Sequence, residues 1–435
     1  MRNPPASRRL LAAGVVAVGL AAAGCGSPSA PAADGAPTPT PVQDRGPITL
    51  ASSKDTTGTV QAQLDRWNTD HPAEKVTLVE LPESADQQRQ LFIQNAQTKS
   101  DAYTVLNMDV VWTAEFAANR WIDELPADKV PTGKMIPAVV ETATYFNKLY
   151  AVPYNTNGGL LFYRKDLLDA AHVQPPTTWA EMKDACAKIK ALPQGKDLSC
   201  YAGQFDKYEG LTVNFAEAVD SAGGSIVDAE GKPTVDTDEA RKGLAFLADS
   251  FKDGTIAKSA ISFKEEEGRR DFQAGKLIFH RQWPYQWELA NKSDGSSKVA
   301  GKFGVAPLPG LTGPGKSSLG GLNLAVSAFA KHKATALDFI SFFASEDNAR
   351  KNLEASSAAP PYADLYTDSE LVKKYPYLPV LRDSINTAAP RPRVVAYGDF
   401  TAVIQENAYA AISGTKPVDQ ALTDMQAGLL KVVSK

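Results

Sequence analysis

The fold follows most directly from residues 105–121, which read VLNMDVVWTAEFAANRW. The first five of these are typical of an apolar strand that ends at Asp109, and the stretch from Val111 to Trp121 favours a helix. We expect the same alternation upstream, with strands at 48–51 and 76–81 and helices at 60–67 and 87–97. This order predicts a mainly parallel, doubly wound sheet. Because ligands of such sheets bind beyond the carboxyl ends of the strands, Asp109 stands where a ligand would be met.

The alternation continues downstream, with a strand expected at 159–164 and a helix at 178–192 that Thr177 or Thr178 would cap. Further helices are expected at 211–221, 238–251, 266–274 and 334–345. About 390 residues follow position 46, which is more than one hydrophobic core usually holds. The sequence therefore predicts two lobes.

The N-terminus has the pattern of an export signal. Three arginines lie within the first nine residues, and the apolar run at 10–23 is shorter than the roughly 20 residues of a membrane-spanning helix. The run ends at Ala22-Ala23-Gly24-Cys25, which resembles a bacterial lipobox, although Ala22 stands where a leucine is usual. We therefore expect a signal peptide at 1–24 and a lipid on Cys25. The alternative is an ordinary secretory signal with a chance cysteine.

A tether would follow the anchor. Residues 26–46 are almost entirely Ser, Ala, Pro, Thr and Gly, so they cannot bury enough surface to offset their ordering entropy, and we expect lipidated Cys25 and a flexible linker at 25–46. The formal net charge of the whole chain is −4 without a basic stripe, which argues against nucleic acid as a partner. No later stretch of the sequence is apolar enough to cross a membrane.

Two further cysteines, Cys186 and Cys200, are separated by residues that include Pro193 and Gly195. In an exported protein a disulfide could close this small loop and contribute up to about 3 kcal/mol in the chain-entropy model. Two unpaired, buried thiols are the alternative.

Catalytic motifs are weak in this sequence. The four histidines are scattered, so no metal site is expected, and no Gly-x-Ser-x-Gly elbow occurs. Residues 310–317 match the phosphate-loop pattern by letters, but Pro314 removes an amide and the following residues indicate a loop and strand, where that site needs a helix. The glutamates at 265–267 lack the facing partner that glycoside hydrolysis needs. We expect neither an enzyme nor a cofactor.

The densest aromatic cluster is Phe-His-Arg-Gln-Trp-Pro-Tyr-Gln-Trp at 279–287. Sugars present an apolar face to aromatic rings and a hydroxyl rim to carboxylates, amides and Arg. A core role is favoured for Phe279 and Trp287. Trp283 precedes a proline, so a loop is expected to present it.

Eight short segments together carry a resemblance that runs from about Ile48 to the C-terminus. They lie at 108–121, 159–168, 208–211, 222–225, 283–285, 304–309, 319–321 and 390–392. In this order they resemble the extracellular solute-binding proteins of carbohydrate ABC importers, most closely the branch that binds trehalose and maltose.

The resemblance implies a two-lobed periplasmic-binding-protein-like fold of type II. Each lobe would be a mainly parallel sheet flanked by helices, with the ligand in the cleft between them. The first lobe would comprise 47–154 and 308–357, and the second 155–307 and 358–435. The chain would cross between the lobes near 153–154, 305–308 and 356–361.

The resemblance also implies a ligand set. Asp109 and Glu266 would accept hydrogen bonds from sugar hydroxyls, with Glu265 and Glu267 as alternatives to Glu266 because three consecutive glutamates leave the register open. Trp283 would stack on the sugar and Tyr285 would offer its hydroxyl. The remaining candidates are Asn157, the backbone amides of Gly320 and Gly321, Arg391 and, with less support, Gln88.

The implied function is capture of an α-glucoside disaccharide, with trehalose ahead of maltose, and its delivery to ABC permease subunits driven by a separate ATPase. We expect a monomer on the extracellular face of the cytoplasmic membrane. A same-fold binder of a longer oligosaccharide or another solute, and a secreted glycoside hydrolase, are the alternatives.

Overall fold

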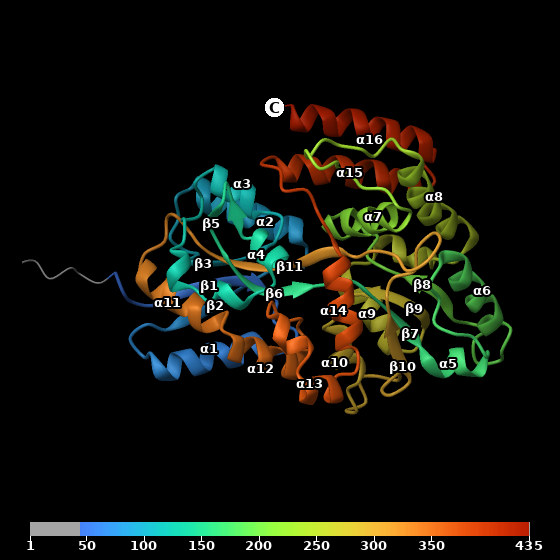
Figure 1. The fold of residues 1–435 in the computed structure, drawn as a ribbon, viewed down its shortest axis with the longest axis horizontal. Helices are drawn as coiled ribbons and strands as arrows, with labels where there is room; N and C mark the ends of the chain where they lie inside the picture. Colours follow the sequence, from blue (N-terminus) through green and yellow to red (C-terminus); the bar gives the residue numbers. More distant parts are fainter. Residues whose placement is uncertain (1–43, 435) are drawn as a thin grey trace, which may run out of the picture. The chain divides into compact units, whose positions relative to one another are not determined.

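The computed structural model describes residues 44–434, which form one compact unit (Figure 1). The expected signal peptide, the lipidated Cys25 and nearly all of the expected linker lie outside the described residues. The last three residues of that expected linker are part of the unit. Asp44 accepts hydrogen bonds from the backbone amides of His332 and Lys333, and Arg45 forms an ion pair with Glu74. These bonds satisfy the free amides at the start of a helix, so Asp44 is tied to the body of the first lobe.

The first lobe is built on the sheet with strand order β12-β11-β3-β1-β2, in which β6 also pairs with β11. Its strands are β1 (Ile48–Ser53), β2 (Val76–Leu81), β3 (Val105–Asp109), β6 (Val152–Asn157), β11 (Ser318–Val326) and β12 (Ala389–Pro390). Strands β2, β1 and β3 run parallel, with α1 (Thr59–Asp70) and α2 (Ala85–Gln97) as crossovers. The predicted βαβα unit is therefore confirmed, and β11 joins it antiparallel to β3.

The second lobe is built on the sheet with order β10-β7-β9-β8. Its strands are β7 (Leu160–Arg164), β8 (Ser199–Ala202), β9 (Leu277–Gln282) and β10 (Phe303–Ala306). The expectation of a mainly parallel sheet is wrong here, because only β8 and β9 pair in parallel. The reason is the path of the chain: β7 enters directly from β6 and leads away from the first lobe, while β8, β9 and β10 run back toward it. Their carboxyl ends thus face the first lobe.

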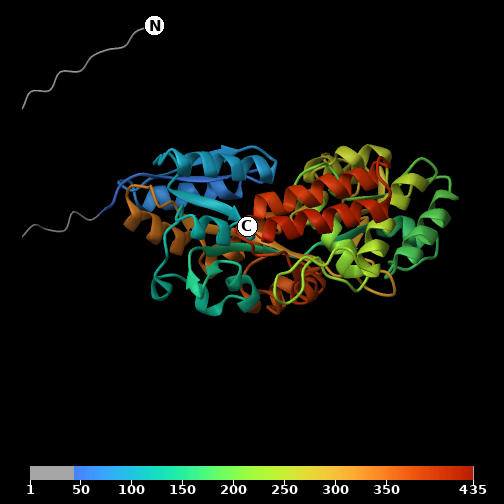
Figure 2. The same ribbon diagram turned by 90° about the horizontal axis from the view of Figure 1, so that it is seen from above.

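Helices flank both sheets. The structure has α3 (Thr113–Ala118), α4 (Pro137–Glu141), α5 (Lys165–Ala170), α6 (Trp179–Lys190), α7 (Glu209–Ser221), α8 (Asp238–Asp253), α9 (Glu265–Gln273), α10 (Gln286–Ala290), α11 (Lys333–Phe343), α12 (Glu346–Ser356), α13 (Ser369–Lys374), α14 (Leu378–Thr387), α15 (Tyr397–Ile412) and α16 (Val418–Val433). Short hairpin strands β4 (Thr144–Tyr145) and β5 (Lys148–Leu149) pair in the first lobe. The C-terminal helices α15 and α16 pack beside α7 and α8 of the second lobe (Figures 1 and 2).

Two helix predictions illustrate how local chemistry sets the bounds. Thr178 caps α6 in a capping box with Glu181, which decides between the two expected caps. The helix expected from Val111 to Trp121 is shorter, at Thr113–Ala118. The carboxylate of Asp109 holds the Val111 amide in a turn, and Arg120 has a φ of 58°, which ends the helix.

Strand pairing places the crossings between the lobes. Only Gly158 and Gly159 separate β6 of the first sheet from β7 of the second, and residues 307–317 lead from β10 to β11. Residues 155–157, which were expected in the second lobe, pair with β11 of the first. Tyr362 also stays with the first lobe, because its backbone bridges to Met135. The connection at 310–317 contains no helix and leads into β11, as predicted for the chance phosphate-loop match.

Candidate functional site

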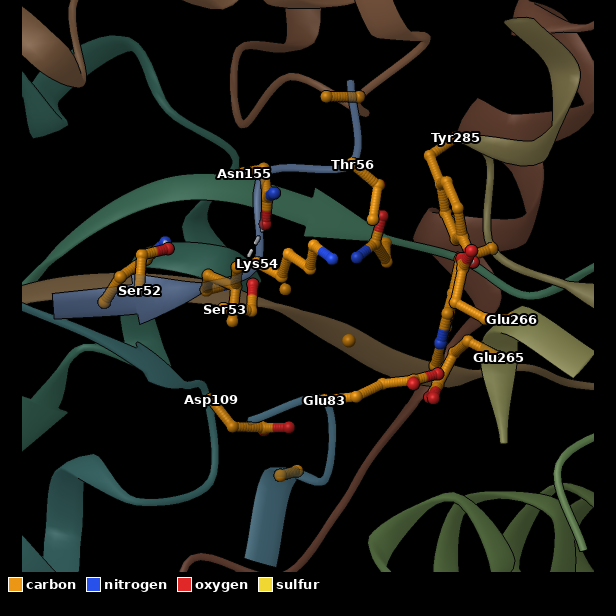
Figure 3. A pocket seen from close by; sticks show the side chains of 18 of the residues that line it. Ser52, Ser53, Lys54, Thr56, Glu83, Asp109, Asn155, Glu265, Glu266 and Tyr285 are labelled. Carbon is orange, nitrogen blue, oxygen red and sulfur yellow. Dashed lines mark hydrogen bonds between the residues drawn. The ribbon is translucent and has the colours of Figure 1, made fainter. Parts of the chain in front are cut away.

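A cavity of ≈ 560 Å³ lies between the two lobes. From the first lobe it is lined by residues that follow β1, β2 and β3, at their carboxyl ends, as expected for an open α/β sheet. The second lobe contributes Gln204 in the loop after β8, the start of α7, the start of α9 and the loop after β9. Figure 3 shows side chains from both lobes reaching into the same space. A ligand in this cavity would contact both lobes.

The structure brings nearly the whole predicted ligand set to this cavity. The predicted residues that line it are Asp109, Asn157, Glu265, Glu266, Trp283, Tyr285, Gly320, Gly321 and Arg391. Gln88 is not among the lining residues. Its side chain is buried, and its amide donates to the backbone oxygens of Pro82 (2.8 Å) and Glu83 (3.4 Å), so it shapes the loop between β2 and α2.

Arg391 links the two sides of the cavity. Its guanidinium donates to Asp109 Oδ1 at 2.8 Å and to Glu209 Oε1, and the Arg391 side chain is 2% exposed. Glu209 also accepts hydrogen bonds from Tyr397 (2.5 Å) and Thr401 (2.7 Å) of α15, so both oxygens of its carboxylate are hydrogen-bonded. Burial raises the pKa of the Glu209 carboxyl, and the Arg391 cation opposes that shift. The Arg391 side chain, which directly follows β12 of the first sheet, is therefore bonded to a carboxylate of each lobe.

Sequence reasoning did not single out Glu209. It lies in the Tyr208–Leu211 segment and begins α7, and an acidic residue at the start of a helix is ordinarily explained by the helix dipole. Its role could have been found only from its buried contacts.

The second-lobe wall holds two of the three consecutive glutamates. Glu266 accepts hydrogen bonds from Tyr285 (2.8 Å) and Arg269 (2.9 Å); burial raises its pKa, but these two partners outweigh burial and lower it. Burial raises the pKa of the neighbouring Glu265 to about 7. Glu267 does not line the cavity. Its carboxylate accepts a hydrogen bond from the Lys264 backbone amide and forms an ion pair with Arg270. In Figure 3 Glu265, Glu266 and Tyr285 lie together on one side, with Glu83 reaching toward them and Asp109 nearby.

Trp283 lies against β11 of the first lobe. The Arg281 guanidinium covers one face of the indole, 3.8 Å from the ring centroid. The ring edge abuts Gly320, where an added Cβ would be 3.0 Å from the indole. Gly321 has a φ of 135°, and a Cβ there would be 2.6 Å from the Asn155 carbonyl oxygen. Because neither glycine carries a side chain, β11 can pass between the Trp283 indole and β6.

The floor of the cavity carries an acceptor without a protein partner. Asn107 is 2% exposed; its amide donates to Ser52 Oγ at 2.9 Å, and its Oδ1 has no hydrogen-bond partner among the described residues. A buried amide oxygen without a partner costs free energy. Lys54 also reaches into the cavity (Figure 3).

Two features are absent from the described residues: a group of side chains that could hold a metal ion, and a helix that could span a membrane. Between residues 44 and 434 no three His, Cys, Asp or Glu side chains group so as to hold a metal ion. Over the same range, no helix has the length and apolar character to cross a membrane.

The model of one protein family, the bacterial extracellular solute-binding proteins, matches residues 51–350. The chain belongs to this family. The solute-binding protein is 32% identical over 371 residues to a "Probable ABC transporter-binding protein" of Deinococcus radiodurans, covering 82% of this chain and 86% of that one. The predicted family is thereby confirmed at the level of ABC-transporter solute-binding proteins.

Solved structures agree with the fold. The solute-binding protein superposes on a maltose-bound protein of T. maritima with a TM-score of 0.83 and 32% identity, covering 88% of this chain and 98% of that one. A solute-binding protein of Agrobacterium vitis with bound D-mannitol gives a TM-score of 0.75 at 25% identity, covering 88% and 96%. The two-lobed periplasmic-binding-protein-like fold is confirmed; of the two main sheets, only that of the second lobe has more antiparallel than parallel pairs.

Proposed function

We propose that this chain is the lipid-anchored sugar-binding component of an ABC importer and that it captures an α-glucoside disaccharide, with trehalose ahead of maltose. The observation that carries the proposal is that one cavity holds both an aromatic platform, the indole of Trp283, and several side chains that accept hydrogen bonds. Trp283 offers a ring to the apolar face of a sugar, while Asp109, Glu265 and Glu266 supply hydrogen-bond acceptors in the same cavity.

The geometry supports binding with closure. Asp109 and Asn107 belong to the first lobe, whereas Trp283, Tyr285 and the glutamates of α9 belong to the second. A sugar that bonds to both sets favours the state in which the lobes are close together. The closed protein would dock on a permease pair driven by a separate ATPase, and a lipid on Cys25 would keep it at the extracellular face of the membrane.

The relatives support the same substrate class. The T. maritima structure holds maltose, and the A. vitis structure holds the polyol D-mannitol. Both ligands are rich in hydroxyl groups, which is the chemistry that the cavity of this chain offers.

Calorimetric titration with trehalose, maltose, sucrose and maltotriose tests the proposal. We expect saturable binding with trehalose tightest, loss of binding in Asp109→Ala, and no hydrolysis of any of the four sugars by the wild type. Tightest binding of maltotriose would favour a longer oligosaccharide. Release of glucose would instead identify a glycoside hydrolase.

The anchor has its own test. Metabolic labelling with a radioactive fatty acid is expected to label the wild-type chain and not the Cys25→Ser variant. Equal labelling of both chains, or of neither, would contradict a lipid on Cys25.

A further inference from the structure

A buried ion pair stands directly behind the Trp283 platform. Arg281, whose side chain is 1% exposed, stacks on the indole and donates to Glu217 through Nε (2.8 Å, to Oε2) and through a second nitrogen to Oε1. A third nitrogen donates to Gln204 Oε1 at 3.0 Å. The guanidinium is thus fixed by a bidentate contact and one further bond, which leaves it a single orientation against the ring.

The same carboxylate holds the chain where it enters the first lobe. Glu217 Oε1 accepts hydrogen bonds from the Ser318 backbone amide (3.1 Å) and the Ser317 hydroxyl (3.3 Å). These two residues end the connection from β10 and begin β11.

A second crossing contacts the pair as well. The Gly159 amide, between β6 and β7, donates to Ser317 Oγ at 2.5 Å. A Cβ at Gly159 would be 2.8 Å from an Arg281 nitrogen and 2.9 Å from Glu217 Oε1, so the crossing backbone lies directly on the ion pair. One buried pair therefore contacts two of the crossings and the aromatic platform.

A buried ion pair of this kind is not expected to add much to the free energy of folding. Buried ion pairs often contribute no more to folding than apolar residues of similar volume, whereas their hydrogen bonds fix geometry. We propose that Glu217 and Arg281 are positioning residues that couple the orientation of Trp283 to the two crossings, so that sugar on the platform and closure of the lobes occur together. This inference rests on the proposed function, because it takes Trp283 as a sugar platform.

The test compares the full-length Glu217→Gln variant with Asp166→Asn, which disrupts the Arg164–Asp166 pair in the same lobe away from the cavity. Maltose affinity is measured by calorimetry and closure by the radius of gyration at saturating maltose. Glu217→Gln is expected to weaken maltose binding at least tenfold and to reduce the contraction. Asp166→Asn is expected to stay within twofold and to contract fully. A Glu217→Gln variant that is less stable but binds and contracts like the wild type would overturn the proposal.

Two further measurements keep the outcome clear. If Glu217→Gln does not fold, the double variant Glu217→Leu with Arg281→Met removes both charges together and is expected to fold. This double variant should still bind maltose at least tenfold more weakly than the wild type. Wild-type affinity would overturn the proposal. If the wild type binds neither trehalose nor maltose, the proposed function fails, and acrylamide quenching decides the inference. The Trp283 contribution, obtained by difference from Trp283→Phe, should be quenched more strongly in Glu217→Gln, and unchanged quenching would overturn the coupling.

Discussion

The guanidinium of Arg391 lies 2.8 Å from Asp109 Oδ1, so a cation that is also bonded to Glu209 of the second lobe is bonded to a carboxylate of the first. Because Glu209, Tyr397 and Thr401 hold the other side of this network, the bond to Asp109 bridges the two lobes. A sugar that enters the cavity meets a site whose charges are already ordered.

The first prediction concerns the stability of this network. Arg391→Ala would leave the carboxylate of Glu209 buried without its cation, which typically costs about 3–5 kcal/mol. The free energy of unfolding in urea measures the effect. As a matched control, Arg350→Ala breaks the partly exposed pair with Asp368 and should cost no more than about 1 kcal/mol. Equal losses in the two variants would contradict a structural role for the network.

The second prediction concerns the glycines beside the platform. Gly321→Ala is expected to lower the free energy of unfolding by about 1–3 kcal/mol, because φ is 135° and the new methyl group would lie 2.6 Å from the Asn155 oxygen. Gly313→Ala is the control, since its Cβ would meet nothing within 4 Å. Thermal or urea unfolding that ranks Gly313→Ala as the more damaging change would show that this geometry is wrong.

The third prediction is a pH dependence that originates from His280. Burial lowers the pKa of this histidine to about 3, and Gln286 opposes the shift only in part through a 2.7 Å bond to Nδ1. Between pH 6.5 and about 3 the unfolded chain takes up a proton that the folded chain does not, so the contribution of His280 to stability is lost as the pH falls. The unfolding free energy of the wild type should fall relative to His280→Gln by about 1.4 kcal/mol per pH unit from pH 6 to pH 4. A difference that stays constant over this range would contradict the buried, neutral imidazole.

The fourth prediction separates the disulfide from the binding site. The structure joins Cys186 of α6 to Cys200 of β8, and neither residue lines the cavity. Replacing both with alanine should lower the free energy of unfolding by about 3 kcal/mol, because the unfolded chain loses a closed loop. Maltose affinity, measured by calorimetry, should remain unchanged; a variant that folds but no longer binds would place the disulfide in the machinery of the site.

Much of the fold could be predicted because the decisive patterns are local. The apolar run before Asp109 and the helix periodicity around it define a βα unit without reference to the rest of the chain. The direction of β7, opposite to that of β8, β9 and β10, could not be predicted in this way, because it depends on how the chain crosses between lobes. The early end of α3 depends on the side chain of Asp109 and the backbone of Arg120, which periodicity does not report.

The residues of the site likewise divide into those that a local motif predicts and those that depend on distant contacts. The resemblance placed Asp109, Trp283 and the two glycines at the cavity, where the structure has them. Gln88 differs because the helix turns its amide toward its own preceding loop. Glu209 and Glu217 act through buried partners far away in the sequence, so no local pattern distinguishes them from ordinary helix residues.

The most direct test of the central proposal is a calorimetric titration of trehalose and maltose into the wild type and Trp283→Ala, side by side. The account predicts saturable binding to the wild type and a loss of at least tenfold in affinity when the indole is removed, because stacking on the sugar is lost. Absence of binding by the wild type, or wild-type affinity in Trp283→Ala, would contradict a sugar site built on this platform.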